Sequence, residues 1–191
     1  MTVKQDGEFV LSLVKDFFKQ KDIVEKLKLF NNLKEEDDRI RGWETWWQVE
    51  FALYLDRHKK VAEWGRECSY DCDKRKTDKN SATIDFWLRK KNCDTSSFIG
   101  IEFKQAWSFS KTIREMLNDI DKICAIRDSD DDLRSLWNVG VYLKDIQHKT
   151  KNLSNKEKID YLKDNSGEYE LTESCIDLFD IKGTEFKVVF F

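Results

Sequence analysis

The sequence of 191 residues contains no proline and no long uncharged apolar stretch. A membrane-spanning helix needs about 20 consecutive apolar residues, and a secretory signal peptide needs an apolar segment near the N-terminus. The first ten residues, MTVKQDGEFV, contain no such segment. We therefore expect a soluble, intracellular protein of the cytoplasm with no membrane partner. The lack of proline carries no functional inference.

Cysteine and net charge also lack the patterns of two common classes. The five cysteines are odd in number and do not follow the spacing of a zinc site. Cys68 and Cys72, with Cys93 nearby, leave a metal or cluster site open, but a fourth ligand is missing and a free buried cysteine is ordinary. Charged residues make up 37% of the chain yet nearly cancel to −3. Global charge does not indicate a nucleic-acid-binding protein, so such a role must come from local patches.

The length and the 40% share of hydrophobic residues suffice for one domain with a real core. We expect a single domain over residues 1–191. Within it, we expect an N-terminal helical extension at 1–41, a core at 42–143 and a C-terminal addition at 144–191.

Apolar periodicity predicts the main elements. Residues 6–30 have the helical spacing of one long or two short amphipathic helices. Packing of these helices on the core is the favoured role, and dimerisation is the alternative. Three further helices are predicted at 42–55, 111–126 and 155–162. Strands are predicted at 61–68, 83–88, 98–105 and 136–143, and an edge or fifth strand at 185–191.

Three charged residues interrupt two short apolar runs between residues 82 and 107. Side chains alternate between the faces of a strand, so Glu102 and Lys104 lie side by side in the second run, and Asp85 interrupts the first. A buried charge is costly unless it is paired, hydrogen-bonded or bound to a metal. We therefore expect Asp85 and Glu102 to share a divalent-metal site beside the ammonium of Lys104. A surface salt bridge on an exposed sheet face is the alternative.

Asp85, followed after a loop by Glu102-Phe103-Lys104, resembles the D…(D/E)xK signature of the PD-(D/E)XK nuclease superfamily, the restriction-endonuclease-like fold. The predicted order of helix, three strands, helix and strand is similar to the αβββαβ core of that superfamily. The resemblance implies an α/β fold with a mixed central sheet, extra N-terminal helices and a C-terminal β-rich addition. Ile84 stands where the name of the superfamily has proline, a departure that many members share.

The resemblance implies hydrolysis of phosphodiester bonds with Mg²⁺ or Mn²⁺ as cofactor. Asp85, Glu102 and the backbone carbonyl of Phe103 would hold the ion, because magnesium prefers oxygen ligands. Lys104 would orient the attacking water or help to deprotonate it, a task that suits a lysine whose pKa is lowered by a neighbouring cation. Gln105 would contact the phosphate or the water.

In this superfamily, a helix before the first core strand commonly supplies a glutamate to the metal site. Glu50 lies within the apolar stripe of the predicted helix 42–55, in the string EFALYL, which resembles the E-x-x-L-x-x-L pattern of such helices. We expect Glu50 to hold a second ion or a metal-bound water. Glu44 is the rival carboxylate, and a Glu50 that is merely paired with a neighbouring arginine or tyrosine is the non-functional alternative.

Basic residues gather around the predicted site. Between residues 57 and 91, lysine and arginine outnumber aspartate and glutamate by five. Such basic loops can neutralise backbone phosphates without reading sequence, although a solvated loop of mixed charge is the alternative. The predicted nucleic-acid contacts are Lys74, Arg75, Lys76, Lys79, Lys111 and Arg114.

The leading hypothesis is a metal-dependent nuclease that acts on DNA. One alternative is a catalytically inactive nuclease-fold module that serves as a protein-binding subunit or inhibitor. Another alternative is a ribonuclease, which the motif does not distinguish from the DNA enzyme. A homodimer or a protein partner would use the N-terminal helices.

Overall fold

The computed structural model describes residues 2–31, 42–95, 97–126, 133–144, 153–167, 169 and 171–191. Three charged or polar stretches of the sequence, at 32–41, 127–132 and 145–152, lie outside the described residues.

Three helices open the described chain and three strands follow, after which a helix, a strand and a helix lead to the last two strands. The helices are α1 (Val3–Phe17), α2 (Lys21–Asn31), α3 (Trp43–Arg57), α4 (Phe109–Ile126) and α5 (Asn155–Asn165), with a short 3₁₀ turn, η2 (Glu173–Cys175). The strands are β1 (Val61–Asp71), β2 (Ser81–Lys90), β3 (Phe98–Ala106), β4 (Leu133–Leu143), β5 (Asp177–Asp180) and β6 (Phe186–Phe190). From α3 to β4 this is the predicted order of helix, three strands, helix and strand.

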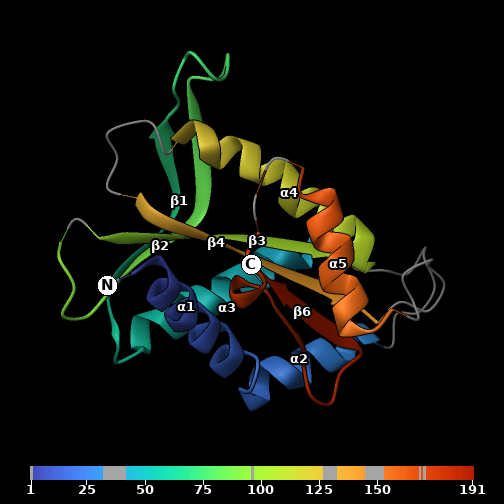
Figure 1. Cartoon of the computed structure of the whole chain (residues 1–191). Coiled ribbons are helices and arrows are strands. Elements are labelled where there is room, and N and C mark those ends of the chain that lie inside the picture. Colours follow the sequence, from blue (N-terminus) through green and yellow to red (C-terminus); the bar gives the residue numbers. More distant parts are fainter. Residues whose placement is uncertain are drawn as a thin grey trace.

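The strands form one mixed sheet in the order β1-β2-β3-β4-β6-β5. Neighbouring strands are antiparallel except β3 and β4, which are parallel and are connected through α4. A parallel pair requires such a crossover connection, usually a helix. The chain therefore has an α/β fold with a mixed central sheet (Figure 1).

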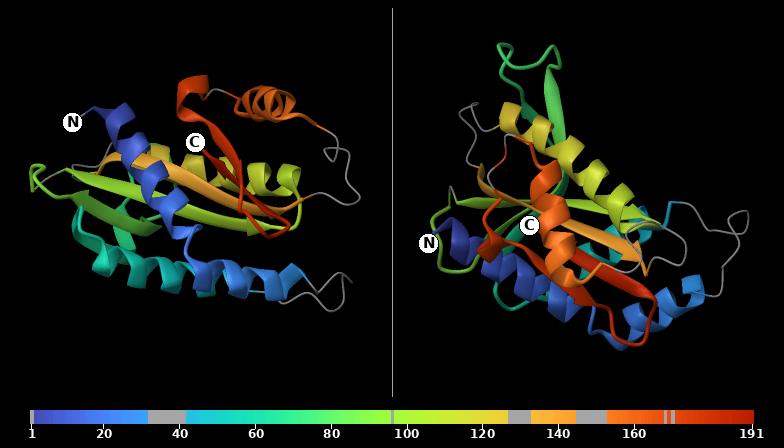
Figure 2. Two further views of the ribbon diagram at one scale, coloured as in Figure 1. Left: turned by 90° about the horizontal axis from the view of Figure 1, so that it is seen from below. Right: turned by 45° about the vertical axis from the view of Figure 1, so that its right-hand side comes forward.

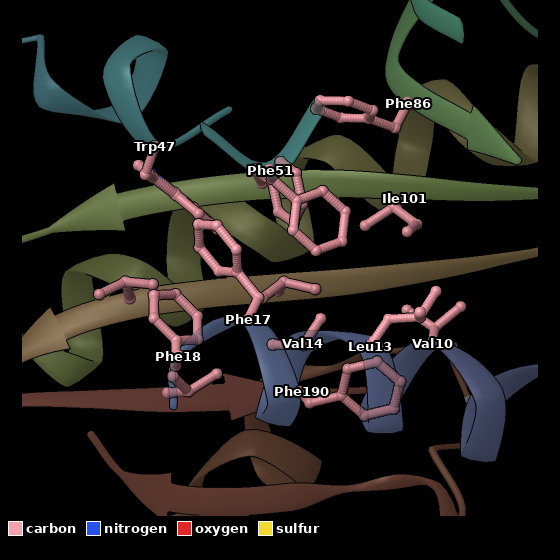
Figure 3. Close-up of a cluster of buried hydrophobic side chains, with 14 of the residues drawn as sticks. Val10, Leu13, Val14, Phe17, Phe18, Trp47, Phe51, Phe86, Ile101 and Phe190 are labelled. Atoms are coloured by element: carbon pink, nitrogen blue, oxygen red, sulfur yellow. The ribbon is translucent and has the colours of Figure 1, made fainter. Parts of the chain in front are cut away.

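Helices cover both faces of the sheet (Figure 2). Buried side chains of α1, α2 and α3 pack on one face, against apolar residues of β2, β3, β4 and β6. Figure 3 shows part of this core, in which Phe17 of α1 lies beside Phe51 of α3 with ring centroids 5.2 Å apart. On the other face, Phe109 and Met116 of α4 pack with Leu162 of α5.

The predictions for the chain's two ends are confirmed only in part. The favoured packing of the N-terminal helices on the core is confirmed, because Val10, Leu13 and Phe17 of α1 are fully buried beneath the sheet. The run at 185–191 is not an edge strand, because β6 lies between β4 and β5. Strand β5 was not predicted, because four residues are too few to show a period.

None of the helices in the described part of the chain is both long enough and apolar enough to span a bilayer.

Strands β2 and β3 separate halfway along β2. The β2–β3 ladder runs from Leu88↔Ile99 to Phe86↔Ile101, whereas β2 remains paired with β1 as far as Ser81↔Asp71. The outer half of the β1–β2 hairpin therefore rises away from β3 (Figure 1). Ile84, on this outer half, packs with Ile126 near the end of α4.

Candidate active site

Asp85 is placed where β2 leaves β3. At this point, the β2–β3 fork, Asp85 is the residue of β2 next to the last strand pair, Phe86↔Ile101. Its Oδ2 accepts a hydrogen bond of 2.8 Å from the backbone N–H of Phe103. Alternate N–H groups of a strand point to the same edge, so Phe103 is the first residue after Ile101 whose amide faces the departed strand. The Asp85 carboxylate takes the place of the missing backbone partner.

Glu44 binds the next backbone N–H on the same edge of β3, that of Gln105. Glu44 lies in the first turn of α3, and its Oε2 accepts a hydrogen bond of 2.6 Å from the N–H of Gln105. Burial raises the pKa of Glu44, and the negative charges of Asp85 and Glu115 add to this effect, while Lys104 and the Gln105 N–H oppose it. Glu44 therefore belongs to the same electrostatic group as Asp85 and Lys104.

Glu102 completes a carboxyl pair with Asp85. Glu102 is 5% exposed, and its carboxyl group is close enough to that of Asp85 for a hydrogen bond between them to lower the pKa of Asp85. Burial raises the pKa of Asp85, although the Phe103 N–H, the Lys104 charge and the bond with Glu102 oppose this shift. Two carboxyl groups this close disfavour simultaneous ionisation, because like charges repel. The fold therefore brings Asp85 and Glu102 next to each other, as the sequence predicts.

Lys104 is held by an acid that the sequence analysis missed. The Lys104 Nζ lies 2.7 Å from Oδ2 of Asp119, a residue of α4 that is 4% exposed. Burial lowers the pKa of Lys104, but the hydrogen bond to Asp119 and the charges of Asp119, Glu44 and Glu102 outweigh it and raise the pKa overall. The expected lowering of this pKa depends on a neighbouring cation, whereas the groups around Lys104 in this structure are acids.

Glu50 is not brought to this group, which corrects the preferred choice of helix carboxylate. Its Oε1 pairs with Nζ of Lys26 on α2 and accepts a hydrogen bond of 3.1 Å from Nε1 of Trp46. Glu44 and Glu50 are six residues apart on α3, so they project from different sides of the helix. The rival carboxylate, Glu44, is the one that reaches β3.

Two further polar side chains have orphaned atoms beside the cluster. Gln105, a predicted site residue, has a buried Nε2 with no hydrogen-bond partner in the part of the chain that the structure describes. Asn138 lies opposite Glu102 in the β3–β4 ladder, and its buried Oδ1 also lacks a partner among those residues. Buried polar atoms are normally hydrogen-bonded, so both atoms are available to a bound group or water.

Sequence signals for Asp119 and Asn138 were present. Asp119 falls seven residues after Thr112 and three after Met116, both of which are buried. An acid at these positions interrupts the apolar stripe of an amphipathic helix. Asn138 is the one amide in the otherwise apolar run LWNVGVYL.

The oxygen atoms of this cluster are of the type that binds a hard cation, but the carboxylates are less closely grouped than in a site that holds an ion. Asp85, Glu102 and Glu44 offer carboxylate oxygens, which Mg²⁺ and Mn²⁺ prefer. The Phe103 carbonyl faces the same strand edge as the Phe103 N–H, and therefore faces Asp85. Within the described ranges, no three His, Cys, Asp or Glu side chains are grouped closely enough to hold an ion as they stand. A bound cation would stabilise the ionised forms of Asp85 and Glu44, whose pKa values are raised by burial.

The six predicted nucleic-acid residues are all exposed and form two groups. Lys74, Arg75, Lys76 and Lys79 lie in the turn of the β1–β2 hairpin, and Lys111 and Arg114 lie near the start of α4. Salt bridges partly neutralise two of them, because Arg75 binds Asp73 at 2.6 Å and Lys111 lies 3.8 Å from Glu115.

The two basic groups lie on either side of the acidic cluster. The hairpin packs near Ile126 at the end of α4, while Arg114 lies near its start. Those twelve residues correspond to about 18 Å of helix, at about 1.5 Å per residue. Asp119, which contacts Lys104, lies between them. The structure therefore does not merge the basic residues into one patch.

The chain was compared with family models, with curated proteins and with solved structures, and none of the three comparisons gives a match. The functional interpretation therefore depends on the residues and geometry described above.

Proposed function

We propose that this chain is a metal-dependent nuclease of the restriction-endonuclease-like fold, with DNA as its substrate. The observation that carries the proposal is the group at the β2–β3 fork, where the Asp85 and Glu102 carboxyls meet beside the Lys104 ammonium and Glu44. The order of elements from α3 to β4 supports the same proposal, because it is similar to the αβββαβ core of the PD-(D/E)XK superfamily.

In this proposal, Asp85 and Glu102 hold a Mg²⁺ or Mn²⁺ ion together with the Phe103 carbonyl. The ion would neutralise phosphate charge and supply an activated water. The Lys104 ammonium stabilises negative charge that develops on the phosphate oxygens. Because its ammonium is paired with Asp119, Lys104 acts in this proposal as a fixed positive charge rather than as a general base.

Other residues of the cluster orient the reacting groups. Asp119 holds the Lys104 ammonium in place. Glu44 fixes the backbone of Gln105. The buried Nε2 of Gln105, which has no hydrogen-bond partner among the described residues, can donate to a phosphate oxygen or a water. The basic residues at the hairpin turn and at the start of α4 would contact backbone phosphates on either side of the cluster, which positions nucleic acid without reading its sequence.

Cleavage assays with matched variants test the proposal. Purified protein is incubated with plasmid, linear duplex, single-stranded DNA and RNA, in Mg²⁺, Mn²⁺ or EDTA. We expect metal-dependent cleavage of DNA, and we expect Glu102→Ala and Lys104→Ala to slow it at least about 100-fold, as loss of a metal ligand or of a transition-state charge does. No cleavage by the wild type, or equal cleavage by these variants, would sink the proposal.

Two glutamates of α3 provide the control. Glu44→Gln, at the cluster, is expected to slow cleavage by about tenfold or more, because the electrostatic group loses a charge. Glu50→Gln changes a carboxylate that contacts only Lys26 and Trp46 among the described residues, so we expect a change of less than about twofold. A larger loss of cleavage in Glu50→Gln than in Glu44→Gln would instead identify Glu50 as the functional residue.

Metal binding has a readout that is independent of cleavage. A cation that binds only the folded state raises the midpoint of thermal unfolding as its concentration rises. We expect Mn²⁺ to raise the midpoint of the wild type and to have no such effect on Asp85→Asn. Equal shifts for both proteins would place the ion elsewhere.

A catalytically inactive, protein-binding module is the second candidate, and one observation favours it. Asp85 and Glu44 each satisfy a backbone amide of β3, and Lys104 is paired with Asp119, so these residues already have structural partners. Such contacts can stabilise a strand edge without any chemistry. Absence of calorimetric Mn²⁺ binding, together with co-purification of a stoichiometric protein partner, would favour this function. Cleavage of RNA but not of DNA would instead identify a ribonuclease.

A further inference from the structure

A cavity lies apart from the acidic cluster, where the end of α1 and the start of α2 meet β5 and the turn that follows it. Its volume is about 540 Å³. Phe18, Val24, Phe179 and Ile181 supply its apolar walls, and Phe18 and Ile181 are almost completely buried. Cavities of this size with mostly apolar walls are typical of sites for small molecules.

Lysines dominate the polar side of this cavity. Lys15, Lys19, Lys21 and Lys182 line it, with Asp180 as the one acid among its lining residues. The charge of Asp180 is already compensated, because its carboxylate lies 3.0 Å from Nζ of Lys187 and 3.5 Å from Nζ of Lys144. The cavity therefore presents an excess of positive charge over an apolar floor.

Two of the four lysines are committed to acids, and two are not. Lys15 pairs with Asp177 at 2.5 Å, and Lys19 pairs with Asp16 at 2.9 Å. Within the described part of the chain, Lys21 and Lys182 form no ion pair. Both side chains are exposed, so their ammonium groups can reach a ligand at the rim while their alkyl stems extend the apolar wall.

We propose that this cavity binds a small amphipathic anion, a molecule with an apolar body and one carboxylate or phosphate head. The body would be buried against Phe18 and Phe179, and the head would pair with Lys21 and Lys182. Charge complementarity determines the sign of the ligand. The volume favours a small molecule, since sites for such ligands measure about 300–1,000 Å³.

Calorimetric titration of the full chain with four probes tests this site. Octanoate and octyl phosphate carry the apolar body with either anionic head, 1-octanol carries the body alone, and acetate carries a head with almost no body. We expect octanoate or octyl phosphate to bind at least about fivefold more tightly than 1-octanol, and acetate not to bind, because both parts of the site contribute. The tighter of the two anions identifies the head group.

The double variant Lys21→Gln/Lys182→Gln places the binding in this cavity. We expect it to reduce the affinity for the anion to that for 1-octanol and to leave the affinity for 1-octanol unchanged. Lys156→Gln on α5, which changes an exposed lysine elsewhere, should bind like the wild type. Both substitutions change exposed side chains, so folding is retained and thermal unfolding verifies it.

Three results would overturn the proposal. These are equal binding of anion and alcohol, full anion binding by the double variant, and a dimer of this chain that the double variant dissociates and that octanoate does not, which would assign the cavity to a second copy. Glu102→Ala should bind the anion normally, so failure of the nuclease proposal and failure of this one are distinguishable.

Discussion

Among single residues, Asp85 gives stability a characteristic pH dependence. Burial raises the pKa of this carboxyl above its ordinary value. Over the pH range between the unfolded and folded pKa values, the unfolded chain has released this proton and the folded protein still holds it, so the free energy of unfolding falls as the pH rises. Asparagine at this position cannot ionise and can still accept the Phe103 N–H bond. We therefore expect Asp85→Asn to remove this fall of the free energy of unfolding with rising pH.

Urea denaturation in EDTA measures the effect. From about pH 4 to about pH 7, the free energy of unfolding of the wild type should fall relative to that of Asp85→Asn. Asp73→Asn is the control, because hydrogen bonds from Arg75 lower the pKa of Asp73 to about 2. The lowered pKa of Asp73 contributes to the free energy of unfolding above the pKa of the unfolded state, and this contribution is lost only as the pH falls below that pKa. The free energy of unfolding of Asp73→Asn should therefore stay parallel to that of the wild type across this pH range. Parallel curves for Asp85→Asn and the wild type would contradict a raised pKa.

The ion pair between Lys104 and Asp119 carries the second prediction at this scale. The side chains are 23% and 6% exposed, so the pair is largely shielded from water. Asp119→Asn keeps a hydrogen-bonding group but removes the charge that opposes Lys104, and we expect it to lower the free energy of unfolding by about 2 kcal/mol. Cleavage should slow by about tenfold, because the ammonium is no longer held in place.

Glu115→Gln is the matched control for Asp119→Asn on α4. Glu115 is 34% exposed and lies 3.8 Å from Lys111, an i,i+4 pair that contributes less than about 0.5 kcal/mol. Chemical denaturation should be close to that of the wild type. Cleavage should slow by much less than about tenfold, because the charge of Glu115 affects the pKa of Glu44 less than Lys104 or Asp85 does. An Asp119→Asn protein that is as stable and as fast as this control would show that the pair has neither role.

The single residues also show how far periodicity could predict the site. Strand alternation placed Glu102 and Lys104 on one face, and the fold brings Asp85 to Glu102 as expected. The choice between Glu50 and Glu44 was wrong because it depended on which elements lie beside α3. The apolar stripe identified the buried side of the helix, but Lys26 comes from α2, whose position no local pattern determines.

At the scale of elements, close packing of α4 on the sheet positions Asp119. Gly140 of β4 allows this approach, because a Cβ there would lie 2.5 Å from both Sδ of Met116 and Cγ2 of Thr112. Gly140→Ala should therefore push α4 away from the sheet and lower the free energy of unfolding by about 1–3 kcal/mol, as overpacking does. Cleavage should fall as well, because Asp119 moves away from Lys104.

Asn118→Ala provides the comparison for Gly140→Ala. Asn118 is an exposed residue of α4, and alanine favours a helix, so we expect no loss of stability. Urea denaturation of the two variants decides the matter. A Gly140→Ala protein as stable as Asn118→Ala would mean that α4 is not packed this closely.

Element types were predictable where the apolar pattern was long. The helix at 42–55 and the strand at 98–105 differ from α3 and β3 by one or two residues at their ends. Strands β1 and β2 extend further than predicted, to Asp71 and from Ser81, because these ends contain too few large apolar residues for a pattern to show in the sequence. Pairing within the hairpin and the burial of Ala82 and Ile84 both stabilise those strand ends.

For the whole molecule, the least predictable feature was the set of partners that the N-terminal helices contact. Periodicity showed that α1 is amphipathic, and packing on the core, the favoured interpretation, is confirmed. In the structure, Asp6 of α1 is fully buried and binds β4, which is 128 residues away in the chain. Such long-range partners arise from the topology of the sheet, so no local window of sequence contains them.

The contact between α1 and β4 carries the last prediction. Asp6 accepts hydrogen bonds from Nε and Nη2 of Arg134 at 2.7 and 2.6 Å, and from Oγ of Ser135 at 3.1 Å. The hydrogen bond from Asp6 raises the pKa of Arg134, as expected for a cation whose partner is buried. Asp6→Ala leaves this guanidinium, 22% exposed, without its carboxylate, and we expect a loss of about 3–5 kcal/mol in the free energy of unfolding.

Glu8→Ala, an exposed change two residues along α1, should alter stability by less than about 0.5 kcal/mol and serves as the control for helix propensity. If α1 were an independent extension, Asp6→Ala would loosen the helix alone, and the urea transition of the sheet, followed by tryptophan fluorescence, would stay in place. We expect instead that fluorescence and far-UV circular dichroism shift together to lower urea, because α1 and the sheet share one core and unfold as one cooperative unit.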